Sequence, residues 1–292
     1  MILVTGATGK VGGQAVSQLL DAGVAVRALT RDPASTIFPK GVEVVRGDLA
    51  DPATLDDALD GVESVFLVWP TLSADHAAPA TIETIAKHAR RIVYLSAHGV
   101  PDPAAGVPEE DPNSILGSHA LLERLIERSG LEWTFLRPGG FAANTLMWAS
   151  QIRDTGTVRW LHGAASRALI HERDIAAAGV SVLTGTGTGT GTGHAGARYV
   201  LSGPEVLTQV EQVTAIGQAI GRPVRWEDLS PETALRELLD QGWPPAAAEE
   251  MVDAYAGMVT SPESVTSTVE ELTGRPATPF RQWAADHADD FR

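Results

Sequence analysis

Short apolar runs alternate with amphipathic stretches along the first half of the chain. The apolar runs predict strands at residues 1–5, 24–29, 42–46, 62–68, 91–95 and 132–136. Stretches with helical periodicity predict helices at residues 14–22, 52–59, 77–89 and 114–129, and Asp51 and Ser114 are expected to cap the second and the last of them. Strands that alternate with helices are typical of a parallel sheet with helices on both faces. We therefore predict an α/β fold built on a doubly wound parallel sheet.

Beyond residue 140 the alternation becomes looser. The patterns there predict strands at residues 199–201 and 224–226, and helices at residues 208–220, 231–239 and 245–257. We assign residues 1–140, completed by roughly residues 168–202, to the sheet domain. Residues 141–167 and 203–292 are assigned to a smaller C-terminal lobe, which we expect to cap a substrate. Residues 184–193 form a Thr-Gly repeat, which cannot build a core and is expected to act only as a connector.

The most informative motif joins the first strand to the first helix. Gly6, Gly9 and Gly12 have the spacing Gly-x-x-Gly-x-x-Gly. Glycines in such a turn let backbone N–H groups approach a pyrophosphate, and the helix N-terminus adds a partial positive charge. The strand at residues 24–29 then completes a βαβ unit, which is the context that this motif requires. The pattern predicts a Rossmann-type dinucleotide-binding core, and the alternative is a structural turn that binds no nucleotide.

The end of the second strand indicates which dinucleotide binds. In such folds an acidic residue here holds the ribose 2′-OH of NAD, whereas an arginine accommodates the 2′-phosphate of NADP. The strand is followed by Arg31 and then by Asp32, which precedes a proline and could simply start a turn. A guanidinium pairs well with phosphate. We therefore expect NADPH (NADP+) as the cofactor.

Composition excludes several classes of function. The formal net charge of −15 argues against a broad basic surface for nucleic acid. The absence of cysteine excludes disulfides and thiolate chemistry, and the histidines show no metal-ligand spacing, so no metal site is expected. The first strand begins at residue 2, and no apolar run reaches the roughly 18 residues that span a membrane. We expect a soluble cytoplasmic protein, a monomer or homodimer, without nucleic-acid or membrane partners.

The spacing Gly-x-x-Gly-x-x-Gly resembles that of the extended and atypical short-chain dehydrogenases, but the usual catalytic pair of that superfamily is missing from this sequence. That pair is Tyr-x-x-x-Lys on the helix after the fifth strand, where the ammonium lowers the pKa of the phenol. None of Tyr94, Tyr199 and Tyr255 has a lysine four residues later, and no lysine follows Lys87. At the corresponding place stand Ser118 and His119. A reaction in this fold would therefore need a different source of protons.

Several motifs nevertheless resemble one branch of that superfamily. They are Gly-Ala-Thr-Gly at residues 6–9, the helix with His119 and Glu123, and Ser-Gly-Leu-x-Trp-Thr-x-Leu-Arg-Pro-Gly at residues 129–139. Together they are similar to the NmrA-like atypical short-chain dehydrogenases, which include NADPH-dependent quinone oxidoreductases, a triphenylmethane dye reductase and redox-sensing regulators. The likeness covers most of the chain and is weakest over residues 230–292.

The resemblance implies a set of cofactor contacts at the loop and at the strand ends. They are Gly6, Thr8, Gly9, Lys10, Val11, Gly12, Arg31, Asp48, Leu49, Val68, Trp69, Ser96, Pro138, Gly139 and Phe141. Asp48 has an alternative role as a turn residue after its strand. Trp69 and Phe141 could also form an aromatic wall for a flat substrate, because both follow strand ends.

Two residues are candidates for the chemistry. His119 shares a helix face with apolar residues, so it is either a buried structural histidine or a cleft residue that donates a proton, for which its ordinary pKa of about 6.5 would suit neutral pH. Glu123, one turn further on, could orient it or could be a solvated charge. Ser96 ends the fifth strand, where its hydroxyl could bind a substrate carbonyl or could only stabilise a turn.

These observations favour an NADPH-dependent reductase. The expected acceptor is a small aromatic or conjugated molecule such as a quinone, an enone or an aryl ketone. A quinone or a cationic dye reaches a stabilised product on hydride addition, so that a dedicated acid is less necessary, and His119, Ser96 or water would supply any proton. The missing pair is equally compatible with an NADP(H)-binding redox sensor that turns nothing over. A third possibility is a cofactor-bound isomerase or cyclase.

Overall fold

The computed structural model describes residues 1–69, 76–102, 114–185 and 193–292. Most of the Thr-Gly repeat therefore lies outside the described residues. The chain divides into two compact units. The first unit comprises residues 1–138, 172–200 and 268–275, and the second comprises residues 139–171, 201–267 and 276–292.

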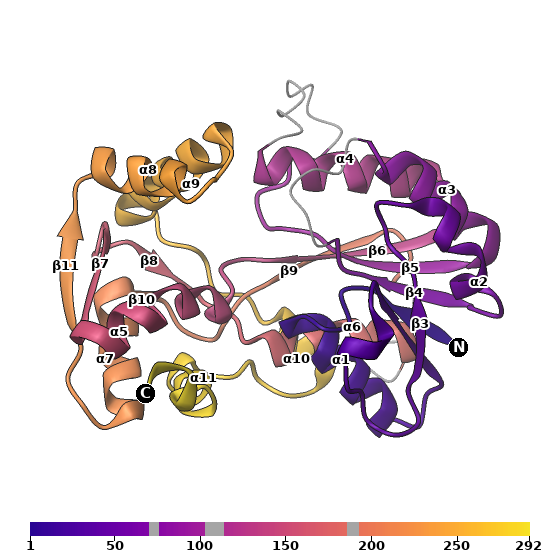
Figure 1. The fold of residues 1–292 in the computed structure, drawn as a ribbon, viewed down its shortest axis with the longest axis horizontal. Helices are drawn as coiled ribbons and strands as arrows, with labels where there is room; N and C mark the ends of the chain where they lie inside the picture. The colour runs from indigo at the N-terminus through magenta and orange to yellow at the C-terminus, as the bar shows by residue number, and fades with distance from the viewer. Residues whose placement is uncertain (70–75, 103–113, 186–192) are drawn as a thin grey trace. The chain divides into compact units, whose positions relative to one another are not determined.

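A seven-stranded sheet forms the centre of the first unit, as far as the described residues show (Figure 1). Its order is β3-β2-β1-β4-β5-β6-β9, and the neighbours from β3 to β6 pair in parallel. The strands are β1 (Ile2–Val4), β2 (Val26–Thr30), β3 (Glu43–Arg46), β4 (Ser64–Leu67), β5 (Arg91–Leu95), β6 (Glu132–Pro138) and β9 (Ala197–Leu201). The chain reverses its direction of winding between β1 and β4, which is where such sheets bind ligands at their carboxyl ends. The predicted fold class is confirmed.

Helices cover both faces of this sheet. They are α1 (Lys10–Asp21), α2 (Asp56–Leu59), α3 (Ala78–His88), α4 (Ile115–Arg128), α6 (Glu172–Thr184) and α10 (Thr268–Thr273). Figure 1 shows α3 and α4 on one face and α1 and α6 on the other. Helix α4 begins where its sequence predicts, because the Ser114 side chain accepts a hydrogen bond from the N–H of Gly117.

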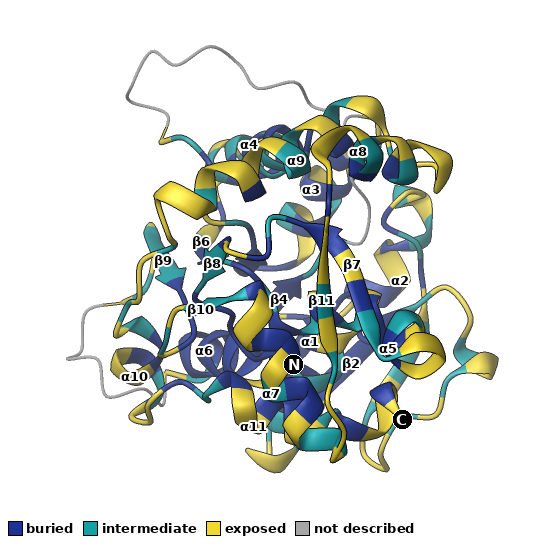
Figure 2. Ribbon diagram, turned by 90° about the vertical axis from the view of Figure 1, so that its left-hand side faces the viewer, coloured by how far each residue is buried: buried dark blue, intermediate teal, exposed yellow. Residues whose placement is uncertain are grey.

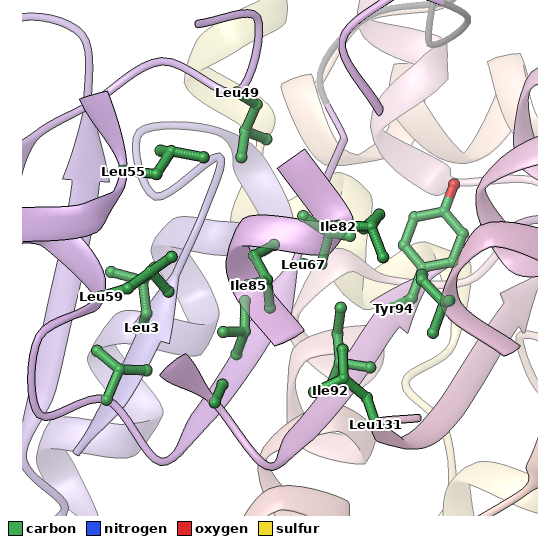
Figure 3. Close-up of a cluster of buried hydrophobic side chains, with 14 of the residues drawn as sticks. Leu3, Leu49, Leu55, Leu59, Leu67, Ile82, Ile85, Ile92, Tyr94 and Leu131 are labelled. Atoms are coloured by element: carbon green, nitrogen blue, oxygen red, sulfur yellow. The ribbon is translucent and has the colours of Figure 1, made fainter. Parts of the chain in front are cut away.

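An apolar core lies between the sheet and the helices of one face. It includes Leu3, Leu67, Ile82 and Ile92, all buried, with side chains from strands and helix in contact (Figure 3). Strand β4 is buried along its whole length (Figure 2). Burying one such side chain contributes about 1.5–3 kcal/mol. The strands are therefore held firmly, and the residues at their carboxyl ends are positioned by a rigid support.

The second unit has its own core. Its elements are η4 (Ala142–Trp148), α5 (Ala149–Thr155), β7 (Thr157–Leu161), β8 (Ser166–Arg167), β10 (Leu207–Thr208), α7 (Gln209–Ile220), β11 (Arg225–Leu229), α8 (Pro231–Asp240), α9 (Pro245–Thr260), α11 (Phe280–Asp286) and η5 (Ala288–Phe291). Trp148, Trp160, Phe280 and Trp283 are buried together in one apolar cluster. Strand β11 pairs in parallel with β7, and β10 pairs antiparallel with β8. Trp148 and Trp160 are thus core residues, and the substrate-capping role of this unit stays a prediction.

The structure corrects three details of the sequence prediction. Helix α1 begins at Lys10 rather than at residue 14, so that Gly12 belongs to its first turn. The helix predicted at residues 52–59 is a 3-10 turn followed by α2, and the side chain of Asp51 makes no capping hydrogen bond. Helix α10 groups with the first unit although residues 203–292 were assigned to the lobe. It packs on α6, where Ser181 Oγ donates to the carbonyl of Leu272 at 2.5 Å.

A buried ion pair joins α4 to the end of β6. Arg137 donates from Nε to one carboxylate oxygen of Glu123 at 2.9 Å and from a terminal nitrogen to the other at 2.6 Å. Both side chains are almost completely buried. Arg137 also donates to Asp102 at 3.0 Å, but the Asp102 side chain is 69% exposed. The same guanidinium therefore has one buried partner and one solvated partner.

We predict that Glu123→Ala lowers the free energy of unfolding by about 3–5 kcal/mol, because it leaves a buried guanidinium without its main partner. The control is Asp102→Ala, which should cost less than about 1 kcal/mol since that pair is screened by solvent. Urea denaturation followed by circular dichroism measures both. Equal losses in the two variants would contradict the assignment of Glu123 as the main partner.

Candidate active site

The glycine loop is tied directly to the end of β4. Thr5 is fully buried, and its Oγ1 donates to the carbonyl of Val68 and accepts from the N–H of Val68, both at 2.8 Å. Gly6 follows with a φ of +56°, in the left-handed region that favours glycine. A Cβ on Gly6 would lie 3.0 Å from the side chain of Val68. The structure thus brings together two predicted cofactor residues from separate strands, Gly6 and Val68.

Gly12 lets the first turn of α1 lie directly against the loop. A Cβ at this position would lie 2.2 Å from the carbonyl oxygen of Gly6, a distance that no side chain can occupy. Gly9 closes the turn by donating its N–H to the same carbonyl at 2.9 Å. The backbone around the loop is therefore shaped by close approach of main chain to main chain, as the glycine spacing predicted.

The N-terminus of α1 suits a phosphate group. Its N-cap is Gly9, which provides no side chain to cap the helix. Thr8, Gly9 and Lys10 are exposed, whereas Val11 is buried below them. The first N–H groups of a helix lack partners within the helix and attract anions. These residues can therefore hold the pyrophosphate of a dinucleotide.

Arg31 and Asp32 have different roles in the structure. The carboxylate of Asp32 accepts a hydrogen bond from the N–H of Ala34 at 3.0 Å and caps the 3-10 turn η1 (Pro33–Ser35). Arg31 is exposed just beyond β2, and among the described residues it has no hydrogen-bond or ion-pair partner. Asp32 is thus engaged in a local turn, while the guanidinium of Arg31 is available for an anion.

Asp48 and Leu49 follow β3 in a compact turn. Asp48 accepts from the N–H of Ala50 at 2.9 Å, and its own N–H donates to Thr54 Oγ1 at 2.9 Å. The carbonyl of Leu49 accepts from Thr81 Oγ1 at 2.8 Å. The carboxylate of Asp48 therefore has the turn role considered from the sequence, and a contact of either residue with the cofactor stays a prediction.

The remaining predicted contacts are divided between the two units. Trp69 is half-buried against the apolar core of the first unit, and Pro138 ends β6 in the same unit. Gly139 and Phe141 begin the second unit. Phe141 lies in a short parallel bridge with Ile170. The part of these four residues in cofactor binding stays a prediction.

Ser96 is not available to a substrate in this structure. Its side chain is 2% exposed, and its Oγ donates to Glu123 Oε1 at 2.5 Å. The hydroxyl proton is therefore already used by the buried carboxylate that binds Arg137. This geometry favours a positioning role for Ser96 over the predicted catalytic one.

His119 makes a contact that its position in the sequence did not indicate. Its Nδ1 lies 2.6 Å from the hydroxyl of Tyr94, which comes from β5. Burial lowers the pKa of His119 to about 4, well below the ordinary value of about 6.5 that would suit acid–base work at neutral pH. In the sequence Tyr94 is distinguished only as a tyrosine without a lysine four residues later. The two residues are 25 positions apart, so no local spacing could have shown the pair.

Comparison with known proteins identifies the family. The model of a family described as NAD(P)H-binding matches residues 6–185, more than half of the chain. The chain belongs to this NAD(P)H-binding family. The motifs that resemble the NmrA-like atypical short-chain dehydrogenases fit the same assignment, so that resemblance is confirmed.

Two curated relatives and one solved structure match this family member over almost their whole length. It is 44% identical over 294 residues to the (4-alkanoyl-5-oxo-2,5-dihydrofuran-3-yl)methyl phosphate reductase of Streptomyces griseus, covering all of this chain and 99% of the relative. It is 35% identical over 299 residues to an NAD(P)H azoreductase of Xenophilus azovorans, covering 100% and 99%. A crystal structure of an NADPH-dependent quinone oxidoreductase from Escherichia coli is 25% identical, with a TM-score of 0.76 and coverage of 98% and 99%. The protein is therefore an NAD(P)H-dependent oxidoreductase.

The geometry of the loop fits the cofactor that the family binds. The close approach at Gly12, the uncapped N-terminus of α1 and the unengaged Arg31 are suited to a dinucleotide with phosphate groups. When bound, NAD(P)H supplies the hydride of the reaction. Among the described residues no helix is both long enough and apolar enough to cross a membrane.

We predict that Gly12→Ala weakens NAD(P)H binding by at least about tenfold, because the new methyl group displaces the Gly6 carbonyl and the loop. Gly13→Ala is the matched control in the same turn, since its Cβ would lie 3.4 Å from the nearest atom, an ordinary contact. Isothermal titration with NADPH measures both affinities. A Gly12→Ala protein that binds as tightly as Gly13→Ala would show that the close approach is not required.

Proposed function

We propose that this protein is an NADPH-dependent reductase that delivers hydride to a flat conjugated acceptor, with a carbon–carbon double bond activated by carbonyl groups as the leading type. The observation that carries the proposal is His119, which stands near the place of the usual Tyr-x-x-x-Lys pair and is kept neutral by burial. A site without a strong acid favours acceptors that stabilise negative charge themselves.

The names of the relatives support this class of acceptor. The Streptomyces griseus relative is a reductase of an oxo-dihydrofuran that carries an alkanoyl group, and the other two act as an azoreductase and a quinone oxidoreductase. An enone, a quinone and an azo compound are all conjugated, and each spreads the electron pair of an added hydride over electronegative atoms. The first relative is the most similar of the three, which is why we put the activated double bond first.

The electrons and protons balance without an acid from the protein. Hydride adds to the carbon β to the carbonyl group, and the electron pair of the double bond moves to the carbonyl oxygen as an enolate. Water then protonates the enolate carbon to complete the reduction. The protein's own contribution is to bind and orient the acceptor, which can supply a large part of the rate acceleration.

The proposal is tested with purified protein and a panel of acceptors. We expect NADPH oxidation, followed by the loss of reduced nicotinamide absorbance, with doubly activated enones and with quinones, and little with simple aliphatic ketones. Tight NADPH binding without turnover across the whole panel would overturn the proposal and would favour the redox-sensor alternative.

The preference for NADPH is tested at Arg31. We predict that Arg31→Ala raises the Kd of NADPH by about ten- to a hundredfold, the loss expected for one charged hydrogen-bonding partner, and changes the Kd of NADH less than about twofold. Arg128→Ala removes a positive charge from the last turn of α4 and serves as the control. Equal weakening of both cofactors in Arg31→Ala would contradict the assignment.

A further inference from the structure

The hydrogen bond between Tyr94 and His119 links the sheet to α4. Tyr94 is completely buried and packs edge-on against Phe135, with 6.1 Å between the ring centroids. Figure 3 shows its hydroxyl pointing away from the aliphatic side chains of the core. His119 is half-buried, and its Nδ1 lies 2.6 Å from this hydroxyl. The contact is therefore made from a rigid strand to a side chain that remains partly accessible.

Both partners of this hydrogen bond are neutral at pH 7. Burial, together with the nearby Glu123 carboxylate, raises the pKa of Tyr94 well above its ordinary value, so Tyr94 remains a phenol. The low pKa of His119 keeps the imidazole neutral at pH 7. A neutral imidazole accepts at one nitrogen and carries its proton on the other. A phenol O–H is a stronger donor than a neutral imidazole N–H, and an unprotonated imidazole nitrogen is a stronger acceptor than a phenol oxygen. We therefore take Tyr94 as the donor to Nδ1, which places the proton of His119 on Nε2.

Tyr94 lies near the edge of the sheet where ligands bind in this fold. Tyr94 is the register partner of Leu67, the last residue of β4, and lies one residue before the end of β5. The carboxyl ends of these strands form the edge where ligands bind. Among the described residues, Nε2 of His119 has no hydrogen-bond partner. Its N–H group is therefore available to a molecule bound at this edge.

We propose that Tyr94 is a positioning residue that holds His119 in its Nε2–H form, so that His119 donates a hydrogen bond to the carbonyl oxygen of the acceptor. This inference rests on the proposed reductase function. His119 stabilises the negative charge that develops on that oxygen and keeps its own proton, and the proton of the product comes from water. Neutral imidazoles are known to polarise carbonyl groups in this way.

The charged groups around the pair are consistent with a neutral donor. On α4 the nearest is Glu123, one turn from His119, and its carboxylate is bound by Arg137 from β6 and by Ser96 after β5. Arg137 in turn binds Asp102. The carboxylate of Glu123 is thus compensated by its own partners and is not free to charge His119.

The first test determines the tautomer in the protein alone. Long-range ¹H–¹⁵N correlation spectra of the labelled protein at neutral pH, with the His119 signals assigned by their loss in His119→Gln, should show protonated Nε2 and unprotonated Nδ1. In Tyr94→Phe the spectra should no longer show protonation at Nε2 alone. A protonated Nδ1 or an imidazolium in the wild-type protein at pH 7 would overturn the proposal.

The second test separates hydrogen-bond donation from proton transfer. His119→Ala should lower kcat about a hundred- to a thousandfold, the usual effect of removing one oxyanion donor, whereas His119→Gln keeps an N–H group and should stay within about tenfold of the wild type. Tyr94→Phe should lower kcat about tenfold with the KM for NADPH unchanged. Tyr199→Phe is the matched control, because it removes a similar hydrogen bond to His194 and should leave kcat unchanged.

The pH profile provides a third readout. Because burial lowers the pKa of His119 to about 4, the imidazole stays neutral over this range and wild-type kcat should be flat from about pH 6 to about pH 8. A decrease of kcat through neutral pH that disappears in His119→Gln, or a His119→Gln protein as inactive as His119→Ala, would show that His119 transfers a proton. Lack of turnover by the wild-type protein would overturn the proposed reductase function. The tautomer of His119 is determined separately, from the ¹H–¹⁵N spectra, which require no turnover.

Discussion

The buried ion pair between Glu123 and Arg137 is the contact on which the arrangement of the chemical side of the site depends. It fixes α4 to the end of β6, and the same carboxylate receives the hydroxyl of Ser96 at the end of β5. Residues four apart lie on one face of a helix, so the contact that fixes Glu123 also fixes the face that carries His119. The enclosed carboxylate has partners on both oxygens, which is the condition for a buried charge to be tolerated.

This arrangement reverses the electrostatics of the common Tyr-x-x-x-Lys pair. There a lysine ammonium lowers the pKa of a phenol and prepares it to exchange a proton. Here burial and a neighbouring carboxylate raise the pKa of Tyr94, and burial lowers that of His119. Both groups therefore stay neutral over the physiological range. Such a pair can orient and stabilise but is poorly suited to transferring a proton, which is consistent with the proposed acceptors that stabilise negative charge themselves.

The sequence was sufficient where the cause of a structure is local. The spacing of Gly6, Gly9 and Gly12 predicted a loop that only glycine can form, and the alternation of apolar runs predicted the strands from β1 to β6. Ser114 was correctly read as a helix cap. In each case neighbouring residues carry the whole physical reason.

The sequence was insufficient where the cause is a distant contact. Ser96 and Glu123 are 27 residues apart, and only the fold shows that the Ser96 hydroxyl donates to the Glu123 carboxylate. The strands β7 and β11 are stabilised by pairing with each other across the second unit, and β8 and β10 are two residues long, too short for a periodic pattern. The pKa of His119 likewise depends on burial, which residue type and spacing do not specify.

The two halves of the site are determined by different kinds of atoms. The cofactor loop is shaped by backbone atoms in close approach, since Gly12 faces a carbonyl and Thr5 binds the main chain of Val68. It can change little without losing its form. The proposed chemical side consists of side chains on α4, β5 and β6, none of which contributes main-chain atoms to the loop. Relatives that match this chain over almost their whole length nevertheless have names that refer to an oxo-dihydrofuran, azo compounds and quinones. A hydride source held by backbone atoms is compatible with that variety, because a different acceptor requires no change in the loop.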